Sequence, residues 1–235
     1  MEKFDVTIIG AGPAGLEAAH RVAEAGLAVL LLEQEPTVGG KLKQWDKLFP
    51  DFTAANEVLE KLKQPLNNPL ITLKTDTASK EIVKQLDNTW KVTDQNGAIY
   101  ESRALLLTTG FDFFDARRKE EYGYGIYPNV LTSVELEEYL AKKELPFLGG
   151  VAERKPQVAF IQCVGSRDEK VGNHFCSRNC CVCAVKQSIE VKEFYPEAQV
   201  YCFYMDLRMF GQSYEELYRK AQQDFGISFV RGRVS

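Results

Sequence analysis

A glycine-rich hexapeptide, Gly-Ala-Gly-Pro-Ala-Gly at residues 10–15, constrains the fold of this 235-residue chain more than any other segment. An apolar run at residues 4–9 precedes it and predicts a buried strand, and the residues after it predict a helix to about Ala25. Gly26 suits the end of that helix, and residues 28–32 predict the next strand. This order of elements indicates an α/β domain with a parallel sheet and a right-handed crossover.

The glycines of the hexapeptide predict a binding site for a dinucleotide. Gly10 permits a tight turn, Gly12 lets the backbone approach a pyrophosphate, and Gly15 allows the helix to pack closely on the strand. The first turn of the helix offers amide donors and the positive end of its dipole to the phosphates. Glu33 ends the second strand, where a carboxylate accepts hydrogen bonds from ribose hydroxyls. The same site is expected to include Ala11, Pro13, Ala14 and Gln34.

The first domain, which this site identifies as a Rossmann-type nucleotide-binding domain, is expected to span residues 1–115. Within it residues 56–63 predict a helix, and residues 104–109 predict another buried strand, which ends before Gly110. A small antiparallel meander is predicted from four short runs, at residues 71–74, 80–85, 90–93 and 99–101.

A connector and a second α/β unit follow the first domain. Residues 116–155 predict the connector, with one helix at 133–143 and a domain boundary near residue 150. Residues 156–235 predict an incomplete Rossmann-like unit, and because the sequence ends on a strand-like segment, we expect this unit to be truncated at its carboxyl end. Its predicted elements are a strand at 157–163, a helix at about 183–194, a strand at 199–204, a helix at 213–225 and a strand at 227–230.

Charge and hydropathy exclude several classes of protein. The formal net charge of −4, the pI near 5.4 and the absence of a long basic run argue against binding to nucleic acid. The longest apolar runs have the length of strands, so no direct membrane insertion is expected. The first strand begins too early to leave room for a signal peptide. A reducing, cytoplasmic location follows, where cysteines are expected to be ligands rather than disulfides.

Five of the six cysteines lie within 21 residues, namely Cys163, Cys176, Cys180, Cys181 and Cys183. Four thiolates suit either a [4Fe–4S] cluster or tetrahedral zinc, a pair at Cys180 and Cys183 suits dithiol redox chemistry, and inert core cysteines are the remaining alternative. No dinucleotide glycine loop follows Cys163, so direct hydride delivery from NAD(P)H is not expected at the second unit. Cys202 lies in an apolar strand and is expected to be buried packing.

Two later segments favour FAD over NAD at the first domain. Residues 38–41 (Val-Gly-Gly-Lys) resemble the double-glycine segment that follows the ribose acid in flavoprotein disulfide reductases. Residues 105–110 (Leu-Leu-Leu-Thr-Thr-Gly) resemble the strand ending in Ala-Thr-Gly that completes the first FAD segment of that family, with threonine in place of alanine at position 108. The resemblance implies that Gly40, Lys41, Thr109 and Gly110 contribute to FAD binding.

The second half of the chain resembles the A subunits of heterodisulfide reductase and their relatives, and the similarity spans essentially the whole sequence. The segments that carry it are residues 118–125 (Arg-Lys-Glu-Glu-Tyr-Gly-Tyr-Gly), 160–168 (Phe-Ile-Gln-Cys-Val-Gly-Ser-Arg-Asp), 176–181 (Cys-Ser-Arg-Asn-Cys-Cys) and 204–208 (Tyr-Met-Asp-Leu-Arg). In that family, cysteines with the spacing C-x12-C-x3-C-C bind a [4Fe–4S] cluster close to FAD. The resemblance implies that the ligands are Cys163, Cys176, Cys180 and Cys181, and that Lys186 is a catalytic residue near the flavin ring.

Archaeal members of that family also carry ferredoxin-type cysteine motifs, which this chain lacks. It is therefore most similar to the short relatives, such as the A subunit of the quinone-interacting membrane-bound oxidoreductase complex. The expected function is that of an oxidoreductase with FAD and a [4Fe–4S] cluster, which passes electrons between the flavin and iron–sulfur partner subunits of a heterodisulfide reductase-like complex. A homodimer is left open as a further assembly.

Two alternatives to this function remain at the level of the sequence. The first is a zinc-stabilised structural module of a larger assembly. The second is an NAD(P)H-dependent thiol oxidoreductase that uses Cys180 and Cys183.

Overall fold

The computed structural model describes residues 2–145 and 155–234. The chain divides into two compact units, of which the first comprises Met1–Trp45 and Ala54–Asp112 and the second comprises Asp46–Thr53 and Phe113–Ser235. The predicted domain boundary near residue 150 lies outside the described residues. The predicted division into residues 1–115, 116–155 and 156–235 stays a prediction.

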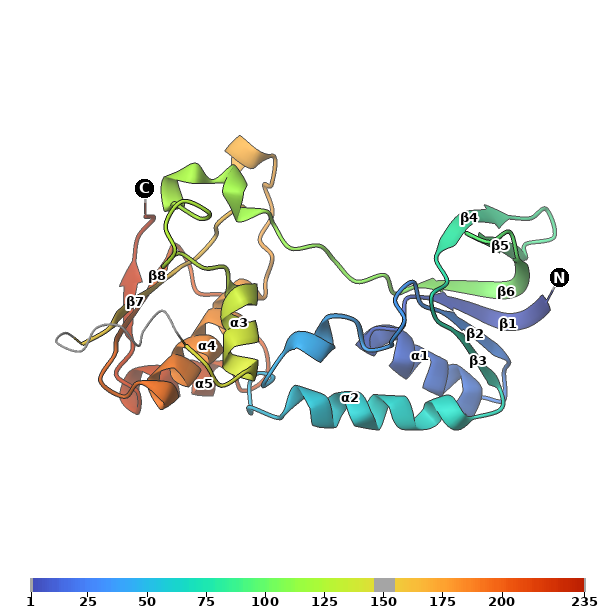
Figure 1. The fold of residues 1–235 in the computed structure, drawn as a ribbon, viewed down its shortest axis with the longest axis horizontal. Helices are drawn as coiled ribbons and strands as arrows, with labels where there is room; N and C mark the ends of the chain where they lie inside the picture. Colours follow the sequence, from blue (N-terminus) through green and yellow to red (C-terminus); the bar gives the residue numbers. More distant parts are fainter. Residues whose placement is uncertain (1, 146–154, 235) are drawn as a thin grey trace. The chain divides into compact units, whose positions relative to one another are not determined.

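The first unit is built on a mixed sheet with the strand order β3-β2-β1-β6-β5-β4 (Figure 1). Strands β1, β2, β3 and β6 are parallel, and the antiparallel pairs β4–β5 and β5–β6 extend the sheet. The strands span Glu2–Ile9 (β1), Val29–Leu32 (β2), Ile71–Lys74 (β3), Ser79–Lys84 (β4), Trp90–Asp94 (β5) and Ile99–Leu107 (β6). The α/β fold expected from the glycine loop is therefore confirmed.

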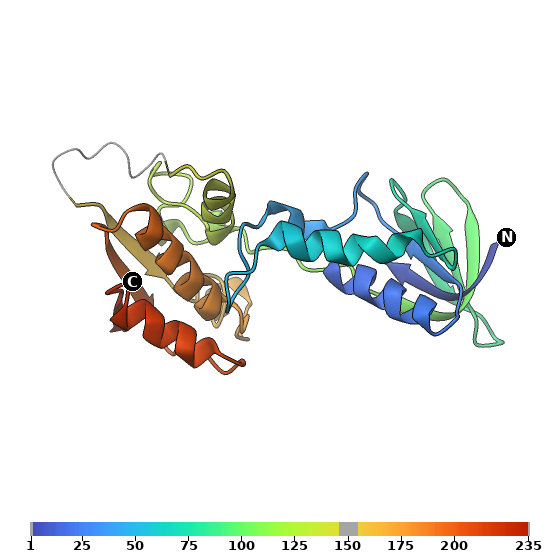
Figure 2. The same cartoon turned by 90° about the horizontal axis from the view of Figure 1, so that it is seen from below.

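Helices α1 (Pro13–Glu24) and α2 (Ala55–Lys63) lie along the same side of strands β1 to β3 (Figures 1 and 2). Strand β2 is fully buried, as expected of a parallel strand that has a neighbour on each side. Two short 3₁₀ helices complete this unit, η1 (Gly40–Gln44) and η2 (Gln64–Asn67). Val92 of β5 and Tyr100 of β6 share a buried cluster with Ile9 and Leu30, so the antiparallel strands pack against the parallel part of the sheet.

Two predictions about the first sheet were wrong in detail. Residues 71–74 do not belong to the antiparallel meander, because they form β3 and pair in parallel with β2. Residues 99–101 and 104–109 are not separate strands, because β6 runs continuously over Ile99–Leu107. Both errors concern which strand each segment pairs with in the sheet. From Tyr100 onward β6 pairs in parallel with β1, and its first residues also pair with β5.

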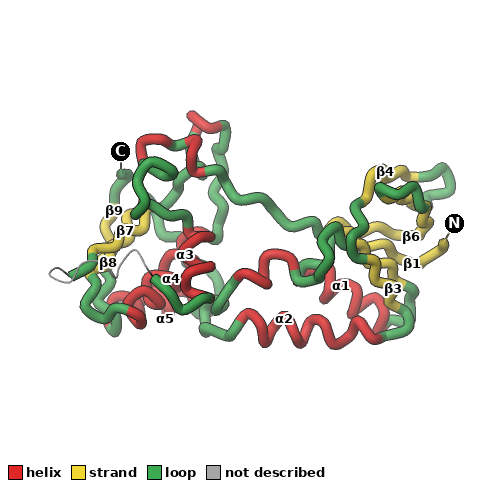
Figure 3. Tube along the Cα trace, viewed as in Figure 1, coloured by secondary structure: helices red, strands yellow, loops and turns green. Residues whose placement is uncertain are grey.

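The second unit contains a parallel sheet with the order β7-β8-β9, formed by Gln157–Ile161, Gln199–Tyr204 and Ser228–Arg231. Its helices are α3 (Ser133–Ala141), α4 (Cys180–Phe194) and α5 (Tyr214–Gln223), and its 3₁₀ helices are η3 (Ala116–Arg118), η4 (Glu120–Tyr122) and η5 (Glu169–Val171). Loops and turns make up most of the chain between β7 and α4 (Figure 3). Helix α4 begins at Cys180, three residues earlier than the sequence predicts.

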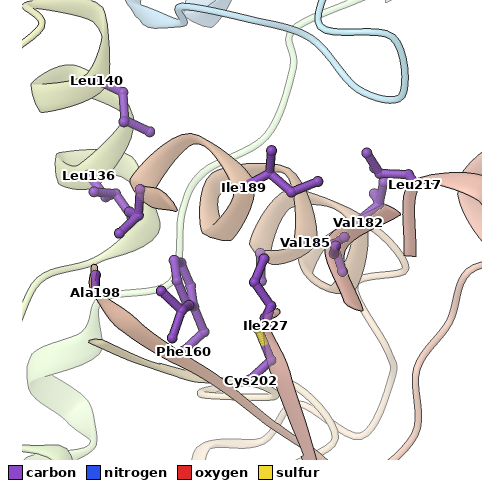
Figure 4. Packing of buried hydrophobic residues seen from close by; sticks show 14 of the residues in the cluster. Leu136, Leu140, Phe160, Val182, Val185, Ile189, Ala198, Cys202, Leu217 and Ile227 are labelled. Carbon is purple, nitrogen blue, oxygen red and sulfur yellow. The ribbon is translucent and has the colours of Figure 1, made fainter. Parts of the chain in front are cut away.

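The core of the second unit forms where α4 packs between the sheet and α3 (Figure 4). Val182, Val185 and Ile189 of α4 are buried with Phe160 of β7. Cys202 of β8 joins them at 1% exposure, which confirms its expected packing role. Burial raises the pKa of this thiol to about 12, so it remains protonated.

Over the part of the chain that the structure describes, no helix combines the length and the apolar surface that crossing a bilayer requires.

Candidate functional site

The glycine loop occupies the turn between β1 and α1, and two of its glycines are fixed by steric contacts. Gly10 has a left-handed φ of 101°, and a Cβ atom there would lie 2.5 Å from the carbonyl oxygen of Thr108. A Cβ atom on Gly15 would lie 1.9 Å from the carbonyl oxygen of Gly10. Both distances are far below contact distance, so this turn requires glycine at both positions.

Gly12 differs from its neighbours because it faces open space. Apart from its own immediate chain neighbours, no heavy atom of the described residues lies within 4 Å of the position that a Cβ would take. Gly12 precedes α1, where Pro13 fills the first helical position and no described side chain caps the first turn. An open position at Gly12 and an uncapped first turn are features of an anion-binding helix start.

The double-glycine segment at 38–41 lies against this loop. The N–H of Gly39 donates to the carbonyl oxygen of Ala11 at 2.8 Å. A Cβ on Gly40 would lie 3.2 Å from the Cα of Gly12. The two glycine segments, 28 residues apart in the sequence, thus form one surface. Beside it, the Lys41 ammonium lies 5.1 Å from the centre of the Phe111 ring.

Glu33 sits at the end of β2 and is only 6% exposed. Its Oε2 accepts a hydrogen bond from the N–H of Ala11 at 2.7 Å, and its Oε1 accepts one from the N–H of Glu35 at 3.0 Å. Each carboxylate oxygen has a second lone pair, so the ribose hydroxyls of a dinucleotide could still bind there. Gln34, also predicted for the site, is exposed next to it.

Thr108 is a residue of this site that the sequence reasoning noted only as a departure from alanine. Its hydroxyl lies 2.7 Å from the carbonyl oxygen of Gly10 and 3.0 Å from that of Ile9, and it can donate to either. This hydrogen bond therefore connects the turn after β1 to the residue that follows β6. Thr109 and Gly110, predicted to bind FAD, follow as exposed residues. The loop, its open space and the acidic residue together fit an FAD nucleotide.

Four cysteines of the second unit lie between the end of β7 and the first turn of α4. Cys163 follows β7 with a left-handed φ of 61°. Cys180 and Cys181 occupy the first turn of α4, and Cys176 lies in the loop before it. The Sγ of Cys176 accepts a hydrogen bond from the N–H of Arg178 at 3.3 Å.

A compact hairpin connects Cys163 to Cys176. Asp168 and Asn173 pair across it, and the Asn173 side chain donates to the carbonyl oxygen of Gly165 at 2.7 Å. The Ser166 hydroxyl donates to the carbonyl oxygen of Phe175 at 2.9 Å. The hairpin returns the chain toward its starting point, which explains how thirteen residues of sequence separation still leave both cysteines in one region.

An ion pair fixes this hairpin to the segment that the sequence assigned to the connector. The Lys119 ammonium lies 2.7 Å from Asp168 and 2.6 Å from Glu121. Lys119 and Asp168 are both only 3% exposed. Sequence reasoning missed this pair, because 49 residues separate its members and neither stands out in composition.

The thiols differ in their electrostatic surroundings. A hydrogen bond between the side chains of Cys180 and Cys181 lowers the pKa of Cys180 to about 6, and the same interaction raises the pKa of Cys181. Burial raises the pKa of Cys163 and brings that of Cys183 to about 12. Within the described residues, no three His, Cys, Asp or Glu side chains are grouped so as to hold a metal ion. Thiols are the donors that iron–sulfur groups use, but in this structure the described thiols are not arranged as a ligand shell.

Lys186, predicted to lie near a flavin, is buried inside the second unit at 3% exposure. Its ammonium lies 2.5 Å from Glu137 of α3 and 2.9 Å from Glu190 of α4. Gln187 also donates to Glu137, at 2.8 Å. Neither Glu190 oxygen has a hydrogen bond of good geometry among the described residues, and burial raises the pKa of this carboxyl to about 7. Sequence reasoning did not identify the two glutamates.

Comparison with known proteins gives a family match over most of the first unit and beyond. The family described as pyridine nucleotide-disulphide oxidoreductase matches residues 4–150. Lactococcus lactis thioredoxin reductase has a similar structure, with a TM-score of 0.60 and 19% identity over 97% of this chain and 64% of that chain. This structural similarity supports the fold.

Curated relatives match nearly the whole chain. The iron-sulfur A subunit of the CoB–CoM heterodisulfide reductase of Methanocaldococcus jannaschii is 33% identical over 96% of this chain and 47% of its own length. The A subunit of the ferredoxin/F420H2-dependent CoB–CoM heterodisulfide reductase of Methanosarcina acetivorans is 32% identical over 98% of this chain and 40% of its own length. The resemblance to heterodisulfide reductase A subunits is therefore confirmed, and the chain spans about half the length of these relatives or less.

Proposed function

Because this chain belongs to the pyridine nucleotide-disulphide oxidoreductase family, we propose that it is an electron-transfer subunit with FAD at the first unit and a [4Fe–4S] cluster at the second. The membership makes it an oxidoreductase. The observation that carries the proposal is the nucleotide site, in which an open Gly12 lies beside the uncapped start of α1 and the buried Glu33.

The residues of the first unit would hold FAD through its nucleotide half. The amides at the start of α1 would bind the pyrophosphate, and Glu33 would accept hydrogen bonds from the ribose. Lys41, Thr109 and Gly110 remain proposed members of this site. When bound, FAD supplies a ring that exchanges electrons in pairs or singly, which allows it to work with one-electron carriers.

The residues of the second unit support an iron–sulfur group rather than a nicotinamide site. A nicotinamide-binding unit needs a short glycine loop between its first strand and the following helix. Here β7 ends at Ile161 and α4 begins only at Cys180, and the cysteine hairpin fills the connection. The proposed ligands are Cys163, Cys176, Cys180 and Cys181. Further support comes from the name of the Methanocaldococcus relative, which describes that protein as iron-sulfur.

Lys186 stays a proposed catalytic residue, and it would have to leave its contacts with Glu137 and Glu190 to act on a bound group. The proposed partners are iron–sulfur subunits of a heterodisulfide reductase-like complex, because the relatives are subunits of such complexes. A homodimer stays a prediction.

The test is anaerobic reconstitution of the full chain with iron, sulfide and FAD. We expect flavin absorbance, iron and sulfide in equal amounts, and an EPR signal that develops on reduction with dithionite. Cys163→Ser should lose the iron signal but keep FAD, whereas Cys183→Ser should keep both. Bound zinc without sulfide would instead identify a structural zinc module. If Cys163→Ser retains both FAD and the cluster, the proposed ligand set is rejected.

A further inference from the structure

Four buried polar side chains of α3 and α4 form a cluster inside the second unit. Glu137 of α3 is 6% exposed, and Lys186, Gln187 and Glu190 of α4 are 3%, 3% and 1% exposed. The Lys186 ammonium lies 2.5 Å from Glu137 and 2.9 Å from Glu190, and no other cation of the described residues forms a salt bridge with either acid. Two ionised carboxyl groups that share one ammonium would leave a negative charge uncompensated where water does not reach.

Hydrogen bonds distinguish the two acids. The Oε1 of Glu137 accepts from Lys186 at 2.5 Å and from the N–H of Asp46 at 3.2 Å, and its Oε2 accepts from Gln187 at 2.8 Å. Both oxygens of Glu190 are shielded from solvent and have no hydrogen-bond partner among the described residues. Because hydrogen bonds to a carboxylate favour its charged form, Glu137 carries a negative charge at lower cost than Glu190. The uncompensated charge therefore falls on Glu190.

Gln187 supplies an acceptor for a proton on Glu190. Its Nε2 donates to Glu137 and to the carbonyl oxygen of Ser133, each at 2.8 Å, so both of its N–H groups are used. Its Oε1 is buried and has no partner among the described residues. Gln187 and Glu190 are three residues apart on α4, a spacing that places helical side chains next to each other. A proton on Glu190 turns one oxygen into a donor, which can then satisfy the Oε1 of Gln187.

We infer that Glu190 is a buried proton-binding site, which carries one proton at neutral pH and donates a hydrogen bond to the Oε1 of Gln187. Proton uptake from water converts the carboxylate to the neutral acid and moves no electron. The charged groups that face Glu190 are Lys186 of the same helix, Glu137 of α3 and Lys47 of the loop before α2. Burial is the main cause that raises the pKa of Glu190 to about 7, in agreement with this geometry. The second unit thus binds and releases a proton near neutral pH, a property separate from the proposed electron transfer.

The test is a pH titration of the full chain, labelled with ¹³C at the glutamate carboxyl carbons and followed by NMR. We expect one carboxyl signal to titrate near pH 7 and to be missing in Glu190→Gln. Glu137→Gln removes a negative charge that shares Lys186 with Glu190, so it should lower the midpoint by about one pH unit, a tenfold weaker binding of the proton. Glu138→Gln is the matched control, since adjacent residues of α3 do not face the same side. It should leave the midpoint unchanged.

Infrared spectroscopy tests the hydrogen bond to Gln187. The C=O stretching band of a protonated carboxyl group should be present in the native chain below neutral pH and absent in Glu190→Gln. Gln187→Met removes the acceptor and should move this band to higher frequency, because the acid then loses its hydrogen bond. An unmoved band in Gln187→Met would overturn the assignment of Gln187 as the acceptor.

The titration decides whether the proton site exists. If every glutamate of the native chain titrates in the usual range of exposed carboxyl groups, the inference is wrong. A signal that still titrates near pH 7 in Glu190→Gln would overturn it as well, because the proton would then lie on another group. Glu190→Gln has nearly the shape of the protonated acid and is expected to fold. If Glu137→Gln does not fold, loss of the signal in folded Glu190→Gln still supports the site.

Discussion

The carboxylate of Glu33 accepts a hydrogen bond from the backbone N–H of Ala11 at 2.7 Å, so the acid at the end of β2 also holds the loop that follows β1. One side chain therefore shapes the glycine loop and keeps lone pairs for the proposed contact with a ribose. This double role makes Glu33 the most informative residue to change in the first unit.

Glu33→Gln should weaken FAD binding roughly 10- to 150-fold, because a hydrogen bond to a charged group contributes about 1.5–3 kcal/mol. Fluorescence titration of the flavin with the apoprotein measures this change. Glu35→Gln alters an exposed neighbour and should bind FAD as the native chain does. If Glu33→Gln and the native chain bind FAD with equal affinity, the Glu33 carboxylate does not contribute to the FAD site.

Gly15→Ala should lower the stability of the first unit, whereas Gly12→Ala should impair FAD binding. A methyl group on Gly15 meets the Gly10 carbonyl at 1.9 Å, so this variant should lose about 1–3 kcal/mol of stability. A methyl group on Gly12 points into open space, so Gly12→Ala should unfold like the native chain yet bind FAD poorly. Urea denaturation and flavin titration of both variants provide the comparison. Normal FAD affinity in Gly12→Ala would show that no pyrophosphate approaches there.

Lys119→Met should loosen the cysteine hairpin, since it removes the cation that binds Asp168 at 2.7 Å. The backbone amides of Arg167 and Asp168, which donate across the hairpin, should then exchange with deuterium faster. Hydrogen exchange measured by mass spectrometry on peptides from this segment reports the effect. Lys170→Met, an exposed change in the same hairpin, is the control. Unchanged exchange in Lys119→Met would mean that the ion pair does not hold the hairpin.

Stability of the second unit should fall as the pH rises from about 4.5 to 7. Burial raises the pKa of Glu190 from 4.5 to about 7, so in this window the folded chain binds a proton that the unfolded chain has released. The charged groups that face Glu190 are Lys186, Glu137 and Lys47. Ionisation of Glu190 is expected to lower the free energy of unfolding by about 3 kcal/mol in total. Urea denaturation at pH 5 and pH 8 should show a smaller loss for Glu190→Gln than for the native chain. An equal loss in both proteins would contradict the assignment to Glu190.

The sequence predicts those parts of the molecule that depend on neighbouring residues. The positions of Gly10, Gly15 and Glu33 follow from the spacing of strand, turn and helix within one short segment, and the structure places all three together. Strand β3 was assigned to the wrong part of the sheet, because its partner β2 is nearly 40 residues away and leaves no local signal. Pairing is a property of the whole fold.

In the second unit, side-chain pairs between distant residues likewise leave no signal in the local sequence. Lys186 meets Glu137 across 49 residues, and nothing in either segment of sequence indicates that they pair. The sequence prediction starts α4 three residues late, although Asn179, a residue type favoured at helix caps, stands directly before Cys180. In the structure the Asn179 side chain makes no capping hydrogen bond.

The hydroxyl of Thr108 binds the carbonyl oxygen of Gly10 across 98 residues of chain. Protein synthesis makes Gly10 early and Thr108 late, so the turn after β1 must wait for most of the first unit to be translated before it can be fastened. The strand that brings Thr108 there, β6, also pairs with β1 along its length. A nascent chain that ends before β6 therefore has every glycine of the loop and lacks the contacts that Thr108 and β6 make with it.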